Sequence, residues 1–150
     1  MKGLPMQLPT ITRFAAGLAC ALFLGSCGMQ KKEPPPKPFI GTKWVVKLDL
    51  PIPGEQPWMR FGDGRMEGFG GCNRVAARYV QDSVGARAIA IGRIDRGTRG
   101  CDSDTQASEA RVLEVLQSVS SYTITIDEMT MSGSGGSLKF QSDPRAEIPK

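Results

Sequence analysis

The chemistry that this sequence can support begins with two cysteines, Cys72 and Cys101. In an oxidising compartment such a pair favours a disulfide bond, which would close a loop of about 29 residues. Two reduced buried thiols and a redox-active pair remain the alternatives, although the spacing is too long for a Cys-x-x-Cys redox motif. Two thiols without histidine also make a poor metal site. The pair therefore predicts a structural cross-link.

The sequence contains no histidine. This removes the commonest general base, the Ser-His-Asp and Cys-His nucleophile systems and histidine-ligated zinc. Asp102 and Asp104 resemble the start of a cation-binding loop, but the residues that follow lack the glycine and the closing glutamate of an EF-hand, so the start of a helix explains them better. We therefore expect no enzymatic activity, no catalytic residue, no metal and no cofactor.

A third cysteine, Cys27, ends the motif Leu24-Gly25-Ser26-Cys27, which resembles a bacterial lipobox. The apolar run before it, residues 14–24, has about 11 residues and is too short for a bilayer span, which takes about 20. A basic start, a short apolar middle and small residues before a cleavage site are typical of a secretory signal peptide. We expect residues 1–26 to be removed and Cys27 to be lipidated. A buried N-terminal helix and an ordinary secretory signal are the alternatives.

The composition after Cys27 predicts a tether followed by one domain. Residues 27–40 are rich in proline and lysine and favour an extended chain, the domain is expected at residues 41–141, and residues 142–150 are expected to be a frayed tail. The net charge of +4 falls to about +2 when Lys2 and Arg13 are removed. This mild excess does not predict nucleic-acid binding, but it could favour anionic polymers or lipids of the envelope.

The lipobox predicts a location in the cell envelope, with a lipid anchor in the membrane and the domain facing the periplasm. Gly28 is not the aspartate associated with retention in the inner membrane, so the outer membrane is the expected site. The partners expected are this membrane and an unidentified envelope protein or small apolar ligand.

The domain is predicted to be mainly β with one helix. Alternating apolar and polar residues and turn-forming glycines indicate strands, whereas Val112, Val115, Leu116 and Val119 form a stripe with helical spacing in residues 107–119. The expected strands are residues 42–48, 58–61, 65–70, 74–80, 86–94, 121–126, 128–132 and 137–141. Short antiparallel strands with tight turns favour a small barrel or strongly curved sheet, with the amphipathic helix at an open end or on one face.

Several motifs of the domain resemble the META domain family, also called HslJ-like. They are Gly70-Gly71-Cys72-Asn73-Arg74, Tyr79, residues 89–92, Thr98-Arg99-Gly100-Cys101, the helical segment 109–116, Tyr122-Thr123-Ile124, residues 138–140 and Trp44. The resemblance implies a lipocalin-like barrel with one helix in a bacterial envelope protein. Family members are linked to heat-shock regulation, novobiocin tolerance and, in some parasites, virulence-associated secretion. The family supplies no established enzymatic activity or ligand, and this chain has Arg99-Gly100 where members often have a more apolar pair.

Four residues are candidates for contact with a ligand or partner. Trp44, Trp58 and Tyr79 could line a pocket, although strand aromatics are more often core residues, and Asn73 could contact a ligand, although bonding to nearby backbone at the bend is the simpler role. The sequence thus predicts a non-enzymatic binding or stress-tolerance module. The alternative is a carrier of a small apolar ligand or lipid inside the barrel.

Overall fold

The structure is a computed structural model that describes residues 32–82 and 87–146. The expected signal peptide, Cys27 and the first residues of the expected tether lie outside the described residues. Residues from Glu33 onward form one compact unit. Its helices are α1 (Ser103–Ser118) and a short 3₁₀ turn (Pro144–Ala146). Its strands are β1 (Lys43–Val46), β2 (Trp58–Gly62), β3 (Arg65–Phe69), β4 (Arg74–Gln81), β5 (Ile89–Ile91), β6 (Asp95–Arg96), β7 (Val119–Thr125), β8 (Glu128–Gly133) and β9 (Gly136–Ser142).

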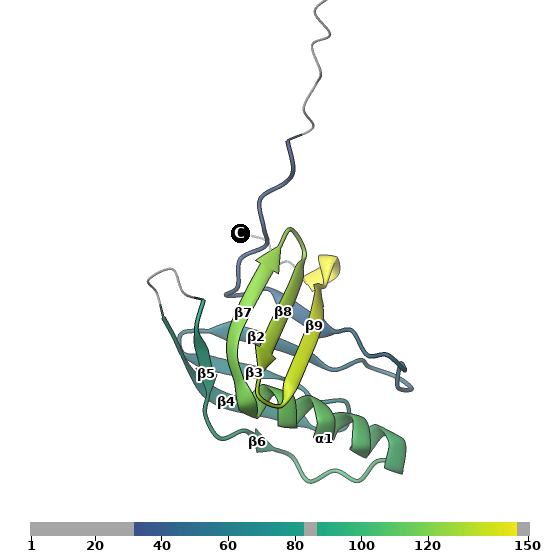
Figure 1. The fold of residues 1–150 in the computed structure, drawn as a ribbon. Coiled ribbons are helices and arrows are strands. Elements are labelled where there is room, and N and C mark those ends of the chain that lie inside the picture. Colours follow the sequence, from purple (N-terminus) through teal and green to yellow (C-terminus); the bar gives the residue numbers. More distant parts are fainter. Residues whose placement is uncertain (1–31, 83–86, 147–150) are drawn as a thin grey trace, which may run out of the picture. The chain divides into compact units, whose positions relative to one another are not determined.

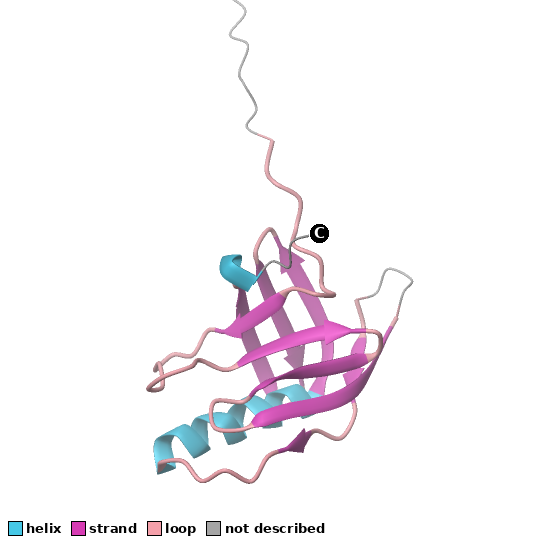
Figure 2. Cartoon of the chain, turned by 180° about the vertical axis from the view of Figure 1, so that it is seen from behind, coloured by secondary structure: helices cyan, strands magenta, loops and turns pink. Residues whose placement is uncertain are grey.

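The strands of the described residues form one antiparallel sheet with the order β5-β4-β3-β2-β1-β9-β8-β7, and β6 pairs with β4. The sheet curls until its two edge strands meet, as Figures 1 and 2 show from opposite sides. Along this seam the main chain is joined by a bridge between Ala88 and Ser121 and by the bond from the Tyr122 N–H to the Arg87 carbonyl. The expected small antiparallel barrel with one helix is therefore confirmed.

The barrel interior is filled by large side chains. Residues pointing inward alternate with outward residues along most of the long strands, as a half-buried strand requires, and a register shift between Val119 and Ser121 interrupts this pattern in β7. The fully buried strand residues are Trp44, Met59, Phe61, Met66, Met129, Met131 and Phe140. The hollows described below are all open surface features, so none of them is a chamber inside the barrel.

One end of the barrel, which we call the helix end, is covered by α1. Asp102 is the N-cap residue: its side chain accepts the Thr105 N–H at 2.9 Å and the Thr105 hydroxyl at 2.7 Å. Val112, Val115 and Leu116 bury the apolar stripe against β5, β8 and β9. Gln117 then donates to the Ile91 and Gly92 carbonyls at 3.0 Å each, so the last turn of the helix is bonded to the end of β5.

The opposite end, which we call the tether end, is where the N-terminal segment enters (Figure 1). The Lys37 N–H donates to the Ile126 carbonyl at 2.6 Å, in the turn between β7 and β8. Phe39 then inserts its ring into the barrel, stacked on Phe61 at 4.4 Å and on Tyr122 at 4.5 Å between ring centroids. Phe39 therefore plugs this end of the barrel.

The structure corrects both expected boundaries of the domain. Residues 37–40 are attached to the barrel rather than part of a free tether, because Phe39 is apolar and gains a buried site between aromatic rings. The expected tail also begins too early. Ser142 ends β9, and the Asp143 N–H donates to the Lys43 carbonyl at 2.9 Å. The domain therefore includes residues on both sides of the predicted 41–141.

Residues 86–94 do not form the single strand that their pattern predicts. Ile91 pairs with Tyr79, whereas Arg96 pairs with Val75, so one extra residue separates the two short ladders along β4. Between the two ladders the chain moves away from β4, and there the Gln117 side chain accepts the Ile94 N–H at 3.3 Å. A side chain of α1 therefore takes the place of a strand partner for Ile94. The local sequence pattern of these residues could not predict this bond.

Candidate functional site

The two cysteines predicted to pair form a disulfide bond at the helix end. The Cys72 and Cys101 sulfurs lie 2.08 Å apart, with 6.0 Å between the Cα atoms, and so the predicted cross-link is confirmed. It joins the bend between β3 and β4 to the segment that leads into α1. We call the two joined segments, residues 70–73 and 97–101, the clamped bend.

A buried carboxylate holds the same bend from the helix side. Glu109 is only 1% exposed, and its Oε2 accepts the Cys72 N–H at 3.0 Å and the Asn73 N–H at 2.6 Å. Its Oε1 accepts the Asn73 side-chain amide at 3.0 Å and faces the Arg96 guanidinium at 3.4 Å. A buried charge is tolerated when hydrogen bonds and an opposite charge surround it, as they do here.

Asn73 uses its polar atoms inside the clamped bend. Its Oδ1 accepts the Arg99 N–H at 2.7 Å, its side-chain amide faces the Arg99 carbonyl at 3.4 Å, and its own carbonyl accepts the Gly70 N–H at 2.8 Å. Together with the bonds to Glu109, these contacts tie the two segments of the bend to each other and to α1. Asn73 is thus placed as a structural residue, in agreement with the simpler of its two predicted roles.

The paired glycines of the bend have physical reasons to be glycine. A Cβ atom on Gly70 would lie 2.8 Å from Glu109 Oε2, closer than real contacts allow, so this position lets the chain approach the carboxylate. Gly71 has a φ of +120°, a backbone conformation that side-chain-bearing residues rarely adopt. The Gly70-Gly71 pair is therefore part of how the bend reaches Glu109.

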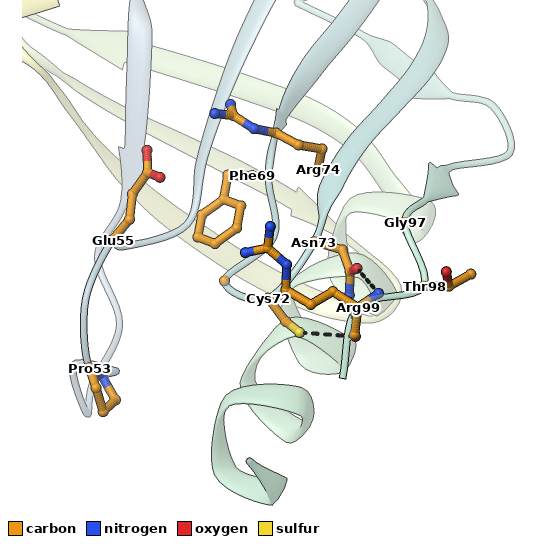
Figure 3. Close-up of a pocket in the computed structure, with 10 residues that line it drawn as sticks. Pro53, Glu55, Phe69, Cys72, Asn73, Arg74, Gly97, Thr98 and Arg99 are labelled. Carbon is orange, nitrogen blue, oxygen red and sulfur yellow. Dashed lines mark hydrogen bonds between the residues drawn. The ribbon is translucent and has the colours of Figure 1, made fainter. Parts of the chain in front are cut away.

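The clamped bend borders an open hollow of about 510 Å³, shown in Figure 3. Phe69 lies at its centre, the guanidinium of Arg99 extends toward this ring, and Arg74 and Glu55 flank the far side. A second hollow of about 290 Å³ lies on the other side of residues 97–99 and reaches Arg96 and Gln106. Because Thr98 and Arg99 line both hollows, they form an exposed ridge between them.

Trp58 lies beside this hollow, on the outer face of the sheet. Three cations cover its ring: Lys43 Nζ at 4.9 Å, the Arg74 guanidinium at 5.4 Å and the Arg60 guanidinium at 5.9 Å from the centroid. Its indole N–H donates to Glu55 at 2.6 Å. Trp58 thus supports the positions of Arg74 and Glu55 at the hollow, while only 9% of its own surface is exposed.

The two other aromatic candidates do not belong to this site. Trp44 is fully buried, and its indole N–H donates to the Phe39 carbonyl at 3.2 Å. Tyr79 is 7% exposed, its ring packs edge-on against Phe61 at 5.4 Å, and burial raises its pKa above the ordinary value. Both are core residues, as the simpler interpretation of strand aromatics predicted.

Glu109 is the residue of the site that sequence reasoning missed. The apolar stripe that predicts the helix does not include this charged residue. Yet it precedes Val112 by three positions and Leu116 by seven, so it lies on the same face, and the structure buries it there. An acidic residue at a core position opposite a Gly-Gly bend is the signal that could have identified it.

The described residues contain neither a cluster of metal-binding side chains nor a helix that could span a membrane. Within residues 32–82 and 87–146, no group of three His, Cys, Asp or Glu side chains is arranged to hold a metal ion. Over the same ranges, no helix is both long and apolar enough to cross a membrane. The predicted absence of a cofactor and of enzymatic activity remains a prediction.

A curled antiparallel sheet with one helix across an end, cross-linked between the β3–β4 bend and the helix start, defines a class of small β-barrel domains. The META domain model matches residues 39–145, and the chain therefore belongs to the META domain family. This confirms the resemblance, and the match begins at Phe39, the residue that plugs the tether end.

Two solved structures show the same fold at low sequence identity, and a third is similar with a lower score. A protein from Burkholderia xenovorans, solved by NMR, is 16% identical with a TM-score of 0.59, over 92% of this chain and 100% of that one. Another NMR structure is 13% identical with a TM-score of 0.54, over 67% and 88%. A DUF4847 family protein from Bacteroides vulgatus is 13% identical with a TM-score of 0.48, over 69% and 93%. No curated protein sequence matches the chain significantly.

Proposed function

We propose that this chain is a non-enzymatic binding module of the bacterial envelope, anchored through a lipid on Cys27 and contributing to stress tolerance. Family membership and the small barrel support the binding module. The lipobox at Leu24-Gly25-Ser26-Cys27 supports the anchor, in the outer rather than the inner membrane, with the domain in the periplasm. Tolerance of heat or novobiocin is the role that the family resemblance suggests.

One observation carries this proposal: the clamped bend holds an exposed, polar surface in a fixed shape. A disulfide, a buried carboxylate and Asn73 all fix the same short segments, although none of them is needed to fill the barrel. The surface that they fix displays Arg74, Arg99 and Phe69 to solvent. Preorganised arginine and aromatic side chains are the groups that dominate binding at protein interfaces. The partner is therefore an envelope protein that presents acidic groups beside an apolar one.

Site-specific photo-crosslinking in living cells tests this assignment. A photoreactive residue at Thr98, on the ridge between the hollows, should yield a defined crosslinked protein, and Arg99→Glu should remove that product because the charge of the ridge is reversed. Thr123, exposed on β7 away from the bend, is the control position. The same product from Thr98 and Thr123, or no product from Thr98, would contradict the proposal.

The anchor and the stress role are tested together by complementation. A strain without the gene should regain heat or novobiocin tolerance with the native chain, and lose most of it with Cys27→Ser, since the domain would no longer be held at the membrane. Fractionation of both strains measures the anchoring directly. Full tolerance with a freely soluble Cys27→Ser protein would separate the stress role from the anchor.

A carrier of a small apolar ligand remains the second candidate, because of one groove at the helix end. The groove has a volume of about 770 Å³ and lies between α1, the start of β9 and the loop after β1. Leu48, Ile52, Val112 and Leu138 contribute apolar surface, and the filled barrel interior makes this groove the better location for such a ligand. Native mass spectrometry should detect a co-purified lipid, and Ala107→Glu should release it by placing a charge in the groove.

A further inference from the structure

Large apolar side chains are exposed at few places in the described residues, and most of them share one end of the barrel. They are Ile40 at 53%, Val80 at 72%, Ile126 at 37% and Leu50 at 84% exposed. Ile40 pairs with Phe61 near the end of β2 and lines a small hollow with Gly64, Tyr79 and Gln81, while Val80 is exposed on β4 one residue before Gln81. Ile126 accepts the Lys37 N–H through its carbonyl. Leu50 lies apart, in the groove at the helix end.

Ile126 is held in a backbone conformation that does not suit it. It is the first residue of the two-residue turn between Thr125 and Glu128, and its φ is +50°. Such turns favour asparagine or glycine, because a β-branched side chain at positive φ is a genuine outlier. The turn therefore carries an apolar, partly exposed side chain against its own conformational preference, and such outliers concentrate at functional sites.

Arginines accompany these apolar residues. Arg65 and Arg78 stand directly opposite each other on β3 and β4, next to the turn that contains Gly64. Like charges in this position are destabilising, and an anion between them relieves the repulsion. Asp63 lies in the same turn and Asp127 beside Ile126, so the charge of this end is mixed, while the directly opposed pair is basic.

The expected lipid anchor at Cys27 indicates that a membrane can come close to the tether end. Cys27 and Lys37 are ten positions apart, and an extended proline-rich chain covers about 3.1 Å per residue, so about 31 Å of chain links a lipidated Cys27 to the tether end. The tether joins the barrel beside Ile126 and Ile40, at the end opposite α1. A lipid on Cys27 would therefore link the bilayer to the end of the barrel that carries these apolar residues.

We propose that the tether end is a membrane-docking rim, formed by Ile40, Val80 and Ile126 with Arg65 and Arg78, which inserts at the surface of a bilayer containing anionic phospholipid. This rests on the lipid anchor of the proposed function, and goes beyond it: the domain lies against the membrane instead of hanging free on its tether. Shallow apolar insertion next to arginines is the usual chemistry of interfacial binding. The clamped bend and α1 then face away from the bilayer.

Fluorescence quenching in vesicles tests the rim directly. Cys27 of the mature chain is coupled to a maleimide lipid in vesicles that contain phosphatidylglycerol and brominated lipid, which is selective because Cys72 and Cys101 are already bonded. A tryptophan is introduced by Val80→Trp at the rim or by Leu50→Trp as the control, and the signal of the buried Trp44 and Trp58 is subtracted. Quenching at Val80 should exceed that at Leu50 by about threefold or more.

Three results would overturn the rim. They are equal quenching at Val80 and Leu50, quenching that does not change when phosphatidylglycerol is replaced by phosphatidylcholine, and a protein dimer in sedimentation that protects Val80 without lipid. Because the lipid is attached chemically, this experiment does not depend on lipidation in the cell. A native chain that is not lipidated would refute the anchor alone, while a lipidated chain without docking would refute the rim alone.

A substitution in the strained turn separates docking from stability. Ile126→Asn should raise the melting temperature in solution, because asparagine tolerates positive φ, and should lower the quenching of the Val80→Trp reporter. Leu50→Asn is the matched control at the helix end and should leave quenching unchanged. A reporter signal unaffected by Ile126→Asn would contradict the role of Ile126 in docking.

Discussion

The two ends of the barrel are closed in different ways. At the helix end, polar and covalent links reinforce the apolar packing of α1: the Cys72–Cys101 disulfide, and Glu109 with its contacts to the clamped bend. At the tether end, closure comes from an aromatic plug, Phe39 between Phe61 and Tyr122. Apolar packing is tolerant of small shifts, whereas a hydrogen-bonded network fixes position and direction. The comparison indicates that the clamped bend is held in a fixed shape at the helix end, while the tether end is closed by packing that tolerates small shifts.

The largest effect is expected from removing the carboxylate of the helix end. Glu109→Ala should lower the free energy of unfolding by about 3–5 kcal/mol, because two backbone N–H groups of the bend and the Asn73 amide lose their buried acceptor. Glu114→Ala, on the exposed side of α1, is the control and should change it by less than about 0.5 kcal/mol. Denaturant titration measures both. A cost for Glu109→Ala as small as the control would mean that the network does not hold the helix end.

The aromatic plug gives the corresponding test at the tether end. Phe39→Ala should cost about 3 kcal/mol, the lower limit for deleting a buried phenylalanine, because part of the ring borders the surface. Phe69→Ala, a half-buried ring on the outer face, is the control and should cost clearly less. The two ends are also expected to differ in kind: a leucine at position 39 should restore much of the loss, whereas no apolar residue should do so at Glu109.

The disulfide is expected to contribute slightly less. For a loop of about 29 residues, the chain-entropy model predicts about 3.6 kcal/mol, and strain lowers the measured value. Unfolding with and without reductant should therefore differ by about 2–3 kcal/mol, and the Cys72→Ser, Cys101→Ser double variant should behave like the reduced protein. The reduced protein should stay folded, because Glu109 still holds the bend. Non-reducing peptide mapping that finds free thiols at both positions would contradict the cross-link.

The smallest effect concerns the helix cap and appears as a pH dependence. Hydrogen bonds from the Thr105 side chain and backbone hold the pKa of Asp102 below its ordinary value. The folded pKa is thus lower than the unfolded one, so this contribution is complete above about pH 4 and is lost as the pH falls through the folded pKa. Asp102→Asn keeps a capping side chain without the charge, and should flatten the stability profile below about pH 4. An unchanged profile would mean that Asp102 does not contribute to the loss of stability at low pH.

Local patterns in the sequence were sufficient for most of the fold. The glycine-marked turns and alternating strands placed the hairpins, and the stripe of Val112, Val115 and Leu116 placed α1 within a few residues. The cysteine pair was found because disulfide chemistry restricts the choices to few residues. The boundary errors at Phe39 and Ser142 have one cause: both residues gain their order from partners far away in the sequence.

The candidate site was harder to predict, since its main interactions run between distant segments. Glu109 bonds Cys72 and Asn73 across more than thirty positions, and nothing in the spacing around Glu109 names these partners. Trp58 was predicted to line a pocket. Its role depends on Lys43, Arg60 and Arg74, which the register of the sheet brings over its ring. Residue type identified these side chains, while three-dimensional pairing decided what they do.

The seam between β5 and β7 has a consequence for how the barrel opens. Elsewhere in the described sheet, neighbouring long strands share continuous ladders, whereas the main-chain links described at the seam are the Ala88–Ser121 bridge and the bond from Tyr122 to Arg87. Local opening follows the path with the fewest bonds to break. The amide of Tyr122 should therefore exchange with solvent deuterium sooner than that of Met131 on β8, so that the rolled sheet begins to unwind along its own edge while the clamped bend is still closed.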